Sequence, residues 1–216
     1  MTSKISLILA GLTLAGMSLA APAAALAENR LPAIPPASYS PEQKKAADDY
    51  LAARHTPLTV GPFIPMMHNP AALTAARQAG DYFRFHTTIG NSVTEWAAMI
   101  TARDWNADYE WSVHAGSAEK EGVSKEMLNA LVDGRRPEGM TPDQTLVYDF
   151  VTELLHNKQV SDVTYGRALG RFGDKGVIDL AGVVGYYTFL AMQLNLAQLP
   201  AIAGSTPLPR LPRAAH

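Results

Sequence analysis

Cysteine is absent from all 216 residues of the chain. The sequence therefore cannot form a disulfide, a thiolate metal site, a thiol nucleophile or a dithiol redox pair. An excess of basic charge is also missing, because 18 Lys and Arg stand against 20 Asp and Glu, for a net charge of −2. This balance gives no indication of a nucleic-acid partner.

Strand-like alternation of polar and apolar residues is missing as well. Apolar residues make up 47% of the chain and recur at helical spacing, so we predict an all-α protein with about seven helices. The expected helices cover residues 41–55, 69–88, 124–132, 141–156, 161–172 and 174–199, and residues 92–122 form two more with a break at 105–107. A chain of this length can bury a core of ordinary size.

The first 27 residues have the pattern of a secretory signal peptide. Lys4 precedes an apolar run over residues 5–20, and Ala25-Leu26-Ala27 offers small residues for cleavage before Glu28. An uncleaved anchor is the less favoured alternative, because the run is short for a bilayer span. We predict export, to the periplasm in a Gram-negative cell. No later segment is expected to cross a membrane.

Prolines mark both ends of the chain that would remain after cleavage. Residues 28–40 form a proline-rich leader, residues 41–200 a helical domain and residues 201–216 an irregular tail. Gly182 and Gly185 lie in a long apolar helix, where each glycine costs about 1 kcal/mol relative to alanine. Close packing of helices would explain that cost. Together these features predict a homo-oligomer of unspecified size.

Three side chains that can transfer protons lie within residues 92–122. Glu110 and His114 are four residues apart, so they share one face of a helix. Glu95 lies one helix earlier and could face this pair if the two helices form an antiparallel hairpin. Such a cluster can perform general acid–base catalysis. The alternatives are a structural Glu110–His114 pair and, for Glu95, a capping box with Ser92.

Several separated motifs agree, in order, with one known family: Glu95, Tyr109-Glu110-Trp111, His114, Ala118, Gly122-Val123-Ser124, Gly185-Tyr186-Tyr187-Thr188 and Asn195. Through them, residues 69–200 resemble the carboxymuconolactone decarboxylase family, in the alkyl hydroperoxidase D-like superfamily. The resemblance implies a helical bundle built around a helix hairpin. Related peroxidases carry a CxxC pair where this chain has Ala107 and Glu110, so the resemblance does not imply thiol peroxidase activity.

The resemblance implies a cofactor-free lyase that decarboxylates a small unsaturated lactone or cyclic carboxylic acid. His114 would deliver a proton to carbon, Glu110 would hold the imidazole, and Glu95 would tune its charge. Four further residues are candidates for binding the substrate: Tyr187, Asn195, His86 and Arg84. Three of them also have an ordinary interpretation, Tyr187 as a core residue and His86 and Arg84 as helix surface or subunit contacts.

Two other classes of function stay open. A helical di-metal protein needs two Glu-x-x-His motifs, and the chain has only Glu153 with His156. A mononuclear Glu/His metal site is the remaining metal alternative. A non-catalytic exported binding or assembly protein predicts that Glu110 and His114 face solvent, or a core without a cavity beside them.

Overall fold

The computed structural model describes residues 29–59 and 61–211, and within these ranges it contains eight α-helices and no strand. The all-α prediction is confirmed, while the predicted signal peptide lies outside the described residues. The helices are α1 (Pro41–Arg54), α2 (Phe63–Met66), α3 (Pro70–Phe85), α4 (Asn91–Asp104), α5 (Asp108–Lys120), α6 (Lys125–Val132), α7 (Pro142–Asn157) and α8 (Asp162–Ala197). A short 3-10 turn, η1 (Pro36–Ser38), precedes them.

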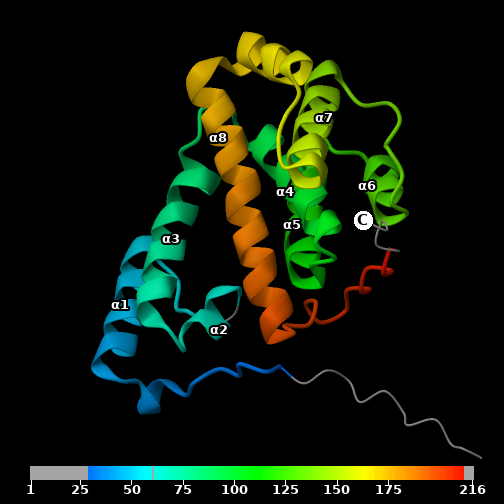
Figure 1. Ribbon diagram of the computed structural model, residues 1–216. Coiled ribbons are helices and arrows are strands. Elements are labelled where there is room, and N and C mark those ends of the chain that lie inside the picture. Colours follow the sequence, from blue (N-terminus) through cyan, green and yellow to red (C-terminus); the bar gives the residue numbers. More distant parts are fainter. Residues whose placement is uncertain (1–28, 60, 212–216) are drawn as a thin grey trace, which may run out of the picture.

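Helix α8 runs through the middle of the molecule (Figure 1). Helices α3 and α1 lie on one side of it, and α4, α5 and α7 lie on the other. Helix α4 packs against α5, α7 and α8, so its residues from Trp96 to Arg103 are all buried. Trp96, Met99 and Leu180 are completely buried, and each such side chain contributes roughly 1.5–3 kcal/mol to stability.

Local capping signals set the start of four helices. In each, the hydroxyl of the residue before the helix accepts a hydrogen bond from a backbone N–H three residues later: Ser40, Ser124, Thr141 and Ser161. The predicted capping box at Ser92 is wrong. Helix α4 begins at Asn91 after Gly90, which has no capping side chain, and Ser92 Oγ donates to the Glu121 carbonyl at 2.9 Å. Capping therefore does not explain Glu95.

One other boundary differs from the sequence-based prediction. The proline-containing segment 56–67, which lies between two predicted helices and was not expected to be helical, contains the short helix α2. The helices predicted over 161–172 and 174–199 are both found, because α8 consists of two helical segments that meet at a kink at Gly173. The φ of Gly173 is 68°, a left-handed conformation that glycine adopts without steric cost.

Two glycines allow α3 and α8 to approach closely. A Cβ atom added to Gly182 would lie 2.1 Å from the Phe83 ring, and one added to Gly80 would lie 2.1 Å from the Tyr186 hydroxyl. The close helix contact predicted at Gly182 is confirmed. Gly185 differs, because an added Cβ there would meet no atom within 4 Å.

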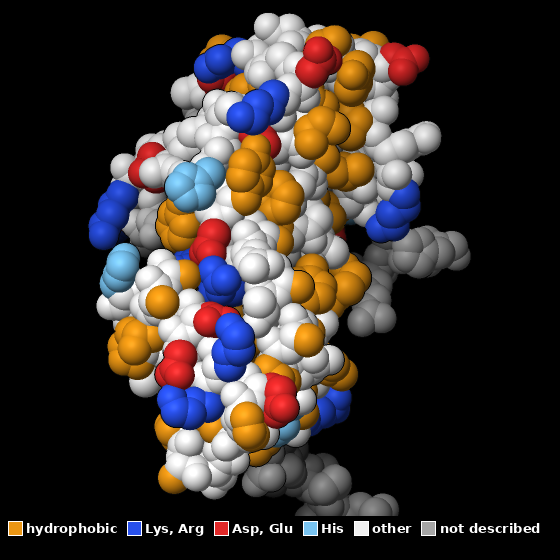
Figure 2. All heavy atoms as spheres, turned by 90° about the vertical axis from the view of Figure 1, so that its left-hand side faces the viewer, with side chains coloured by type: hydrophobic (Ala, Val, Ile, Leu, Met, Phe, Trp, Pro, Cys, Tyr) orange, Lys and Arg blue, Asp and Glu red, His pale blue; other side chains and the backbone are white. Residues whose placement is uncertain are grey.

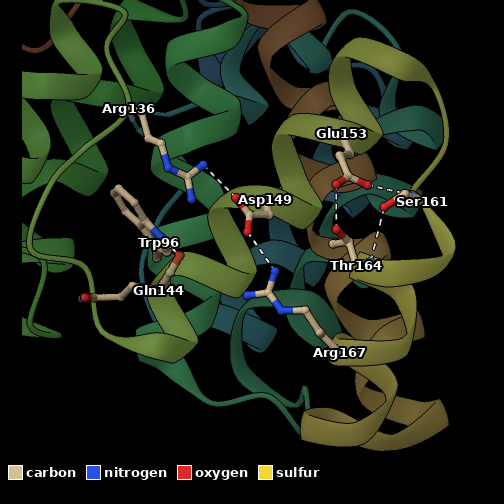
Figure 3. A network of polar contacts seen from close by, with 8 residues as sticks. All are labelled: Trp96, Arg136, Gln144, Asp149, Glu153, Ser161, Thr164 and Arg167. Atoms are coloured by element: carbon tan, nitrogen blue, oxygen red, sulfur yellow. Dashed lines mark hydrogen bonds and ion pairs between the residues drawn. The ribbon is translucent and has the colours of Figure 1, made fainter.

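Polar contacts connect α7 to the beginning of α8 (Figure 3). Glu153 accepts a hydrogen bond from the Thr164 hydroxyl at 2.6 Å, which holds the two helices together. Asp149 lies between Arg136 and Arg167, at 2.7 and 3.0 Å. These pairs are partly exposed, so each adds little to stability on its own.

The outer face of α1 is polar. Figure 2 shows the side of the molecule that carries α1 and α3, where Lys and Arg side chains interleave with Asp and Glu. On α1 these include the pairs Lys44–Asp48 and Lys45–Asp49, one helical turn apart. Ala46 is the only residue within α1 that is fully buried. Helix α1 is therefore held mainly by its contact with α3.

Helix α8 corrects one expectation about membranes. By length and composition alone, this helix could span a bilayer. From the sequence, no such segment was expected after residue 27. Within the described fold, 56% of its most apolar window is buried against other helices. This burial is typical of the core helix of a helical bundle.

Residues 198–211 after α8 contain no helix, in agreement with an irregular tail. They are nevertheless tied to the body of the protein. The buried guanidinium of Arg103 donates to the Pro209 carbonyl at 2.8 Å, and Arg210 pairs with Asp108 at 2.6 Å.

Candidate active site

A tight turn between α4 and α5 positions the candidate site. Asn106 adopts a left-handed conformation with φ of 48°, and the Ala107 N–H donates to the Ala102 carbonyl at 2.9 Å. Ala102 and Ala107 pack against Ala191 of α8. Because these side chains are small, the turn can lie directly on α8, and the two helices can face each other along their length.

The helix pair brings the three proton-transfer side chains together. His114 Nδ1 lies 2.8 Å from Glu95 Oε2, and His114 Nε2 lies 3.4 Å from Glu110 Oε2. The His114 and Glu110 side chains are only 4% and 3% exposed, whereas that of Glu95 is 15% exposed. The expected return of Glu95 to face Glu110 and His114 is therefore found.

Tyr187 of α8 completes this cluster. Its hydroxyl lies 3.5 Å from His114 Nε2, and its ring meets the imidazole edge to face, with 5.1 Å between ring centres. Burial raises the pKa of Tyr187, so the phenol stays protonated at neutral pH. We name Glu95, Glu110, His114 and Tyr187 the acid–base cluster.

The environment of His114 favours its charged form. Burial alone would lower the pKa of the imidazole, but hydrogen bonds to Glu110 and Glu95 and the charges of both outweigh burial and raise it. Both ring nitrogens then carry protons, one facing each carboxylate. The contact to Glu110 is the longer one, so the Nε2 proton is the less firmly held of the two.

Glu110 has an oxygen without a partner. Its Oε1 atom is buried, and no described residue forms a hydrogen bond with it. A buried carboxylate oxygen in this state is costly in structural terms, which makes it a candidate for a functional role. Glu110 can therefore accept or donate a proton without breaking an existing hydrogen bond at Oε1.

A cavity of about 130 Å³ adjoins the cluster. It is lined by residues from α1, α2, α3, α5 and α8 and from the loop before α2. The lining residues are Tyr50, Arg54, Gly61, Pro62, Phe63, Arg84, Tyr109, Glu110, Val113, His114, Tyr186 and Leu190. The non-catalytic alternative expected no cavity beside Glu110 and His114, so this geometry disfavours it. Glu95 and Tyr187 lie behind His114 and do not line the cavity.

The four candidate substrate-binding residues separate into different places. Arg84 lines the cavity, and Tyr187 contacts His114 from the side of α8. His86 is exposed at the end of α3 and does not line the cavity. Asn195 lies in a different and larger cavity of about 690 Å³, where its amide donates to the Trp105 carbonyl at 2.8 Å.

Sequence reasoning missed several residues of the cavity wall, among them Arg54, Tyr50 and Tyr186. Arg54 and Tyr50 belong to α1, which carries no motif and has no regular apolar face. Tyr186 belongs to a motif quoted for the family resemblance but was not singled out. Tyr109 could have been found, because it directly precedes Glu110.

The geometry also bears on the metal alternatives. The two nitrogens of His114 point to different carboxylates on opposite sides of the ring, so the three side chains do not converge on one point. Glu153 holds Thr164, and His156 pairs with Asp104 at 2.7 Å near the surface. Among the residues described, no group of three or more potential ligands is arranged to hold a metal ion.

The chain matches no protein-family model, and no curated protein is significantly similar to it. The functional interpretation therefore depends on the residues and geometry described above.

Proposed function

We propose that this protein is a cofactor-independent lyase that decarboxylates a small unsaturated lactone or cyclic carboxylic acid. The observation that carries this proposal is an imidazole buried between two carboxylates, with a cavity directly against it. Desolvated acid–base groups beside a cavity are typical of active sites. The same proposal includes the finer fold assignment, an alkyl hydroperoxidase D-like bundle of the carboxymuconolactone decarboxylase family.

The reaction needs one proton donor and a place for negative charge. The bond between a ring carbon and the carboxylate carbon breaks, carbon dioxide leaves, and the electron pair moves into the conjugated carbonyl. The resulting dienolate takes a proton on carbon, which His114 Nε2 supplies either directly or through Glu110. Solvent then returns a proton to His114, so the overall change is the replacement of a carboxylate by hydrogen.

In this proposal Glu95 takes over the holding role expected of Glu110 from the sequence, and Glu110 takes part in proton transfer. Glu95 makes the shorter contact, so it orients the ring and stabilises the imidazolium. Glu110 lines the cavity and has a free oxygen, so it can relay the proton between Nε2 and the substrate. Tyr187 packs against the ring and limits its rotation.

The cavity sets limits on the substrate. A volume of about 130 Å³ suits a molecule with on the order of ten non-hydrogen atoms, if each occupies about as much as one water probe. Arg84 in the wall can hold a carboxylate or an enolate oxygen. Burial opposes the charge of Arg84, but its pKa is raised overall, with the carboxylates of Glu95 and Glu110 among the causes, so the guanidinium stays charged.

Export and assembly are part of the proposal. The signal-like sequence of residues 1–27 supports export to the periplasm. Exposed apolar residues on α8, including Ile178, Phe189 and Leu196, support a homo-oligomer. The partners proposed are a small-molecule substrate and further copies of the chain.

The direct test is turnover of a panel of unsaturated lactones and cyclic acids by the mature chain. Turnover is measured as the release of carbon dioxide. We expect His114→Ala and His114→Gln to lower kcat by about 100- to 10,000-fold, the usual contribution of general acid–base catalysis. His156→Ala is the matched control, because His156 also pairs with a carboxylate but does not line the cavity.

Circular dichroism of each variant separates loss of chemistry from loss of fold. A folded His114→Gln protein that turns over the substrate at the wild-type rate would refute the proposed role of the imidazole. Failure of every lactone and acid in the panel would refute the proposed reaction.

A further inference from the structure

Two arginines of the cavity wall contact the same aromatic ring. The guanidinium carbons of Arg54 and Arg84 lie 4.9 and 5.2 Å from the centre of the Phe85 ring. Arg54 ends α1, whereas Arg84 and Phe85 belong to the last turn of α3. Phe85 thus gathers two positive charges from two helices beside one cavity.

The charges of these arginines are only partly matched by protein carboxylates. Arg54 Nε lies 2.7 Å from Asp81 Oδ1, without hydrogen-bond geometry, and Asp81 also pairs with Arg77. Two guanidinium groups therefore share one carboxylate. Arg84 forms no hydrogen bond or ion pair with any residue in the described ranges.

Arg54 also has a donor group without an acceptor. Its Nη2 atom is buried, and no described residue accepts a hydrogen bond from it. Buried guanidinium donors are normally satisfied, because leaving one unpaired costs free energy. Because Arg54 lines the cavity together with a second arginine, its unpartnered donor makes the pair a candidate for binding a small anion.

We propose that Arg54 and Arg84 form a carboxylate-binding subsite in the wall of this cavity. The subsite deepens the proposed function, on which it rests, because it specifies where a carboxylate of the substrate is held and adds Arg54 to the residues that hold it. Arginine suits this task, since its planar donors match the two oxygens of a carboxylate. Phe85 acts as a positioning residue for both guanidinium groups.

The subsite has a consequence for α1. This helix has one fully buried residue and packs mainly on α3, so it is weakly held. A carboxylate shared by Arg54 and Arg84 connects the end of α1 to the end of α3. Amide hydrogens of α1 should therefore exchange more slowly when the anion is bound.

The test measures binding without turnover. Benzoate and the neutral benzamide, which have nearly the same shape, are titrated into the mature protein by calorimetry at fixed ionic strength. We expect benzoate to bind at least about tenfold more tightly than benzamide, and Arg54→Met and Arg84→Met each to remove about tenfold of benzoate affinity. Exchange of α1 amides should slow with benzoate in the wild type and not in Arg54→Met.

Two further variants control for structure. Arg77→Met is the matched control, because Arg77 pairs with Asp81 but does not line the cavity, and we expect less than about a threefold change. If a methionine variant fails to fold, the lysine variant at that position keeps the charge but loses the paired donors, and should still bind benzoate several-fold more weakly.

The results also separate this subsite from the reaction. Equal binding of benzoate and benzamide, unchanged benzoate binding in the Arg54→Met/Arg84→Met double variant, or no benzoate binding to the wild type would overturn the subsite. Inorganic phosphate that binds more tightly than benzoate would overturn its assignment to a carboxylate. Arginine-dependent benzoate binding in a protein that turns over no lactone or acid would support the subsite and refute the lyase.

Discussion

The protein contains two histidine–carboxylate pairs of almost equal length in opposite environments. His114 and Glu95 are 2.8 Å apart, and His156 and Asp104 are 2.7 Å apart. The His114 side chain is 4% exposed, whereas that of His156 is 61% exposed. Water screens the outer pair, while the inner pair depends on protein groups alone, so burial rather than distance distinguishes a candidate catalytic group from a surface contact.

The largest expected difference between the two pairs is in stability. His114→Ala leaves Glu95 and Glu110 buried without their shared partner, which should lower the free energy of unfolding by about 3 kcal/mol or more. His156→Ala should lower it by no more than about 0.5 kcal/mol. Urea denaturation of both variants measures these free energies of unfolding. Equal losses in the two variants would contradict the claim that burial makes the His114 pair different from the His156 pair.

A smaller effect should appear in the pH dependence of stability. The pKa of His114 is raised above its ordinary value of 6.5, so the folded protein holds this proton more tightly than the unfolded chain does. Its stabilisation is complete below pH 6.5 and is lost as the pH rises through the raised pKa. The free energy of unfolding should therefore fall across this range, by at most about 1.4 kcal/mol per pH unit.

Variants of His114 and its partners test the cause of this pH dependence. Glu110→Gln and Glu95→Gln should each lower the pKa of His114, as measured by NMR titration of the imidazole, because each removes a charge that stabilises the imidazolium. The fall in stability should be absent from His114→Gln, and Asp104→Asn should leave the pKa of His114 unchanged. A pH profile that is the same in His114→Gln and the wild type would assign the effect to another group.

The smallest effect is expected from salt on the outer pair. Asp104→Asn should change the unfolding free energy by less than about 0.5 kcal/mol, and that difference should vanish in about 1 M NaCl. The loss caused by His114→Ala should persist at the same salt concentration, because ions do not reach a buried pair. Loss of the His114 effect in salt would indicate that water enters the cluster.

Local signals in the sequence predicted most of the helical framework. Ser40, Thr141 and Ser161 mark helix starts because each hydroxyl binds backbone groups of its own first turn. The boundary predicted between residues 172 and 174 coincides with the kink at Gly173, where glycine tolerates the positive φ. The capping box predicted at Ser92 was wrong, because the Ser92 hydroxyl donates to the distant Glu121 carbonyl and does not cap its own helix.

The candidate site was only partly predictable for the same reason. Glu110 and His114 share a helix face by spacing, and a hairpin was sufficient to bring Glu95 to them. Arg54 reaches the cavity through the packing of α1 on α3, which no local pattern indicates. Asn195 was misplaced because it belongs to the same helix as Tyr187 but lies two turns further along, beside Trp105.

The glycines between α3 and α8 restrict how the binding cavity could change during evolution. Phe83 occupies the space beside Gly182, and Tyr186 the space beside Gly80, so the two helices interlock in one register. A methyl group at either glycine would require the facing ring or the helix that carries it to move, and Phe83 is the direct neighbour of Arg84. If the position of Arg84 is under selection, Gly80 and Gly182 should be under selection as well, although neither glycine lines the cavity.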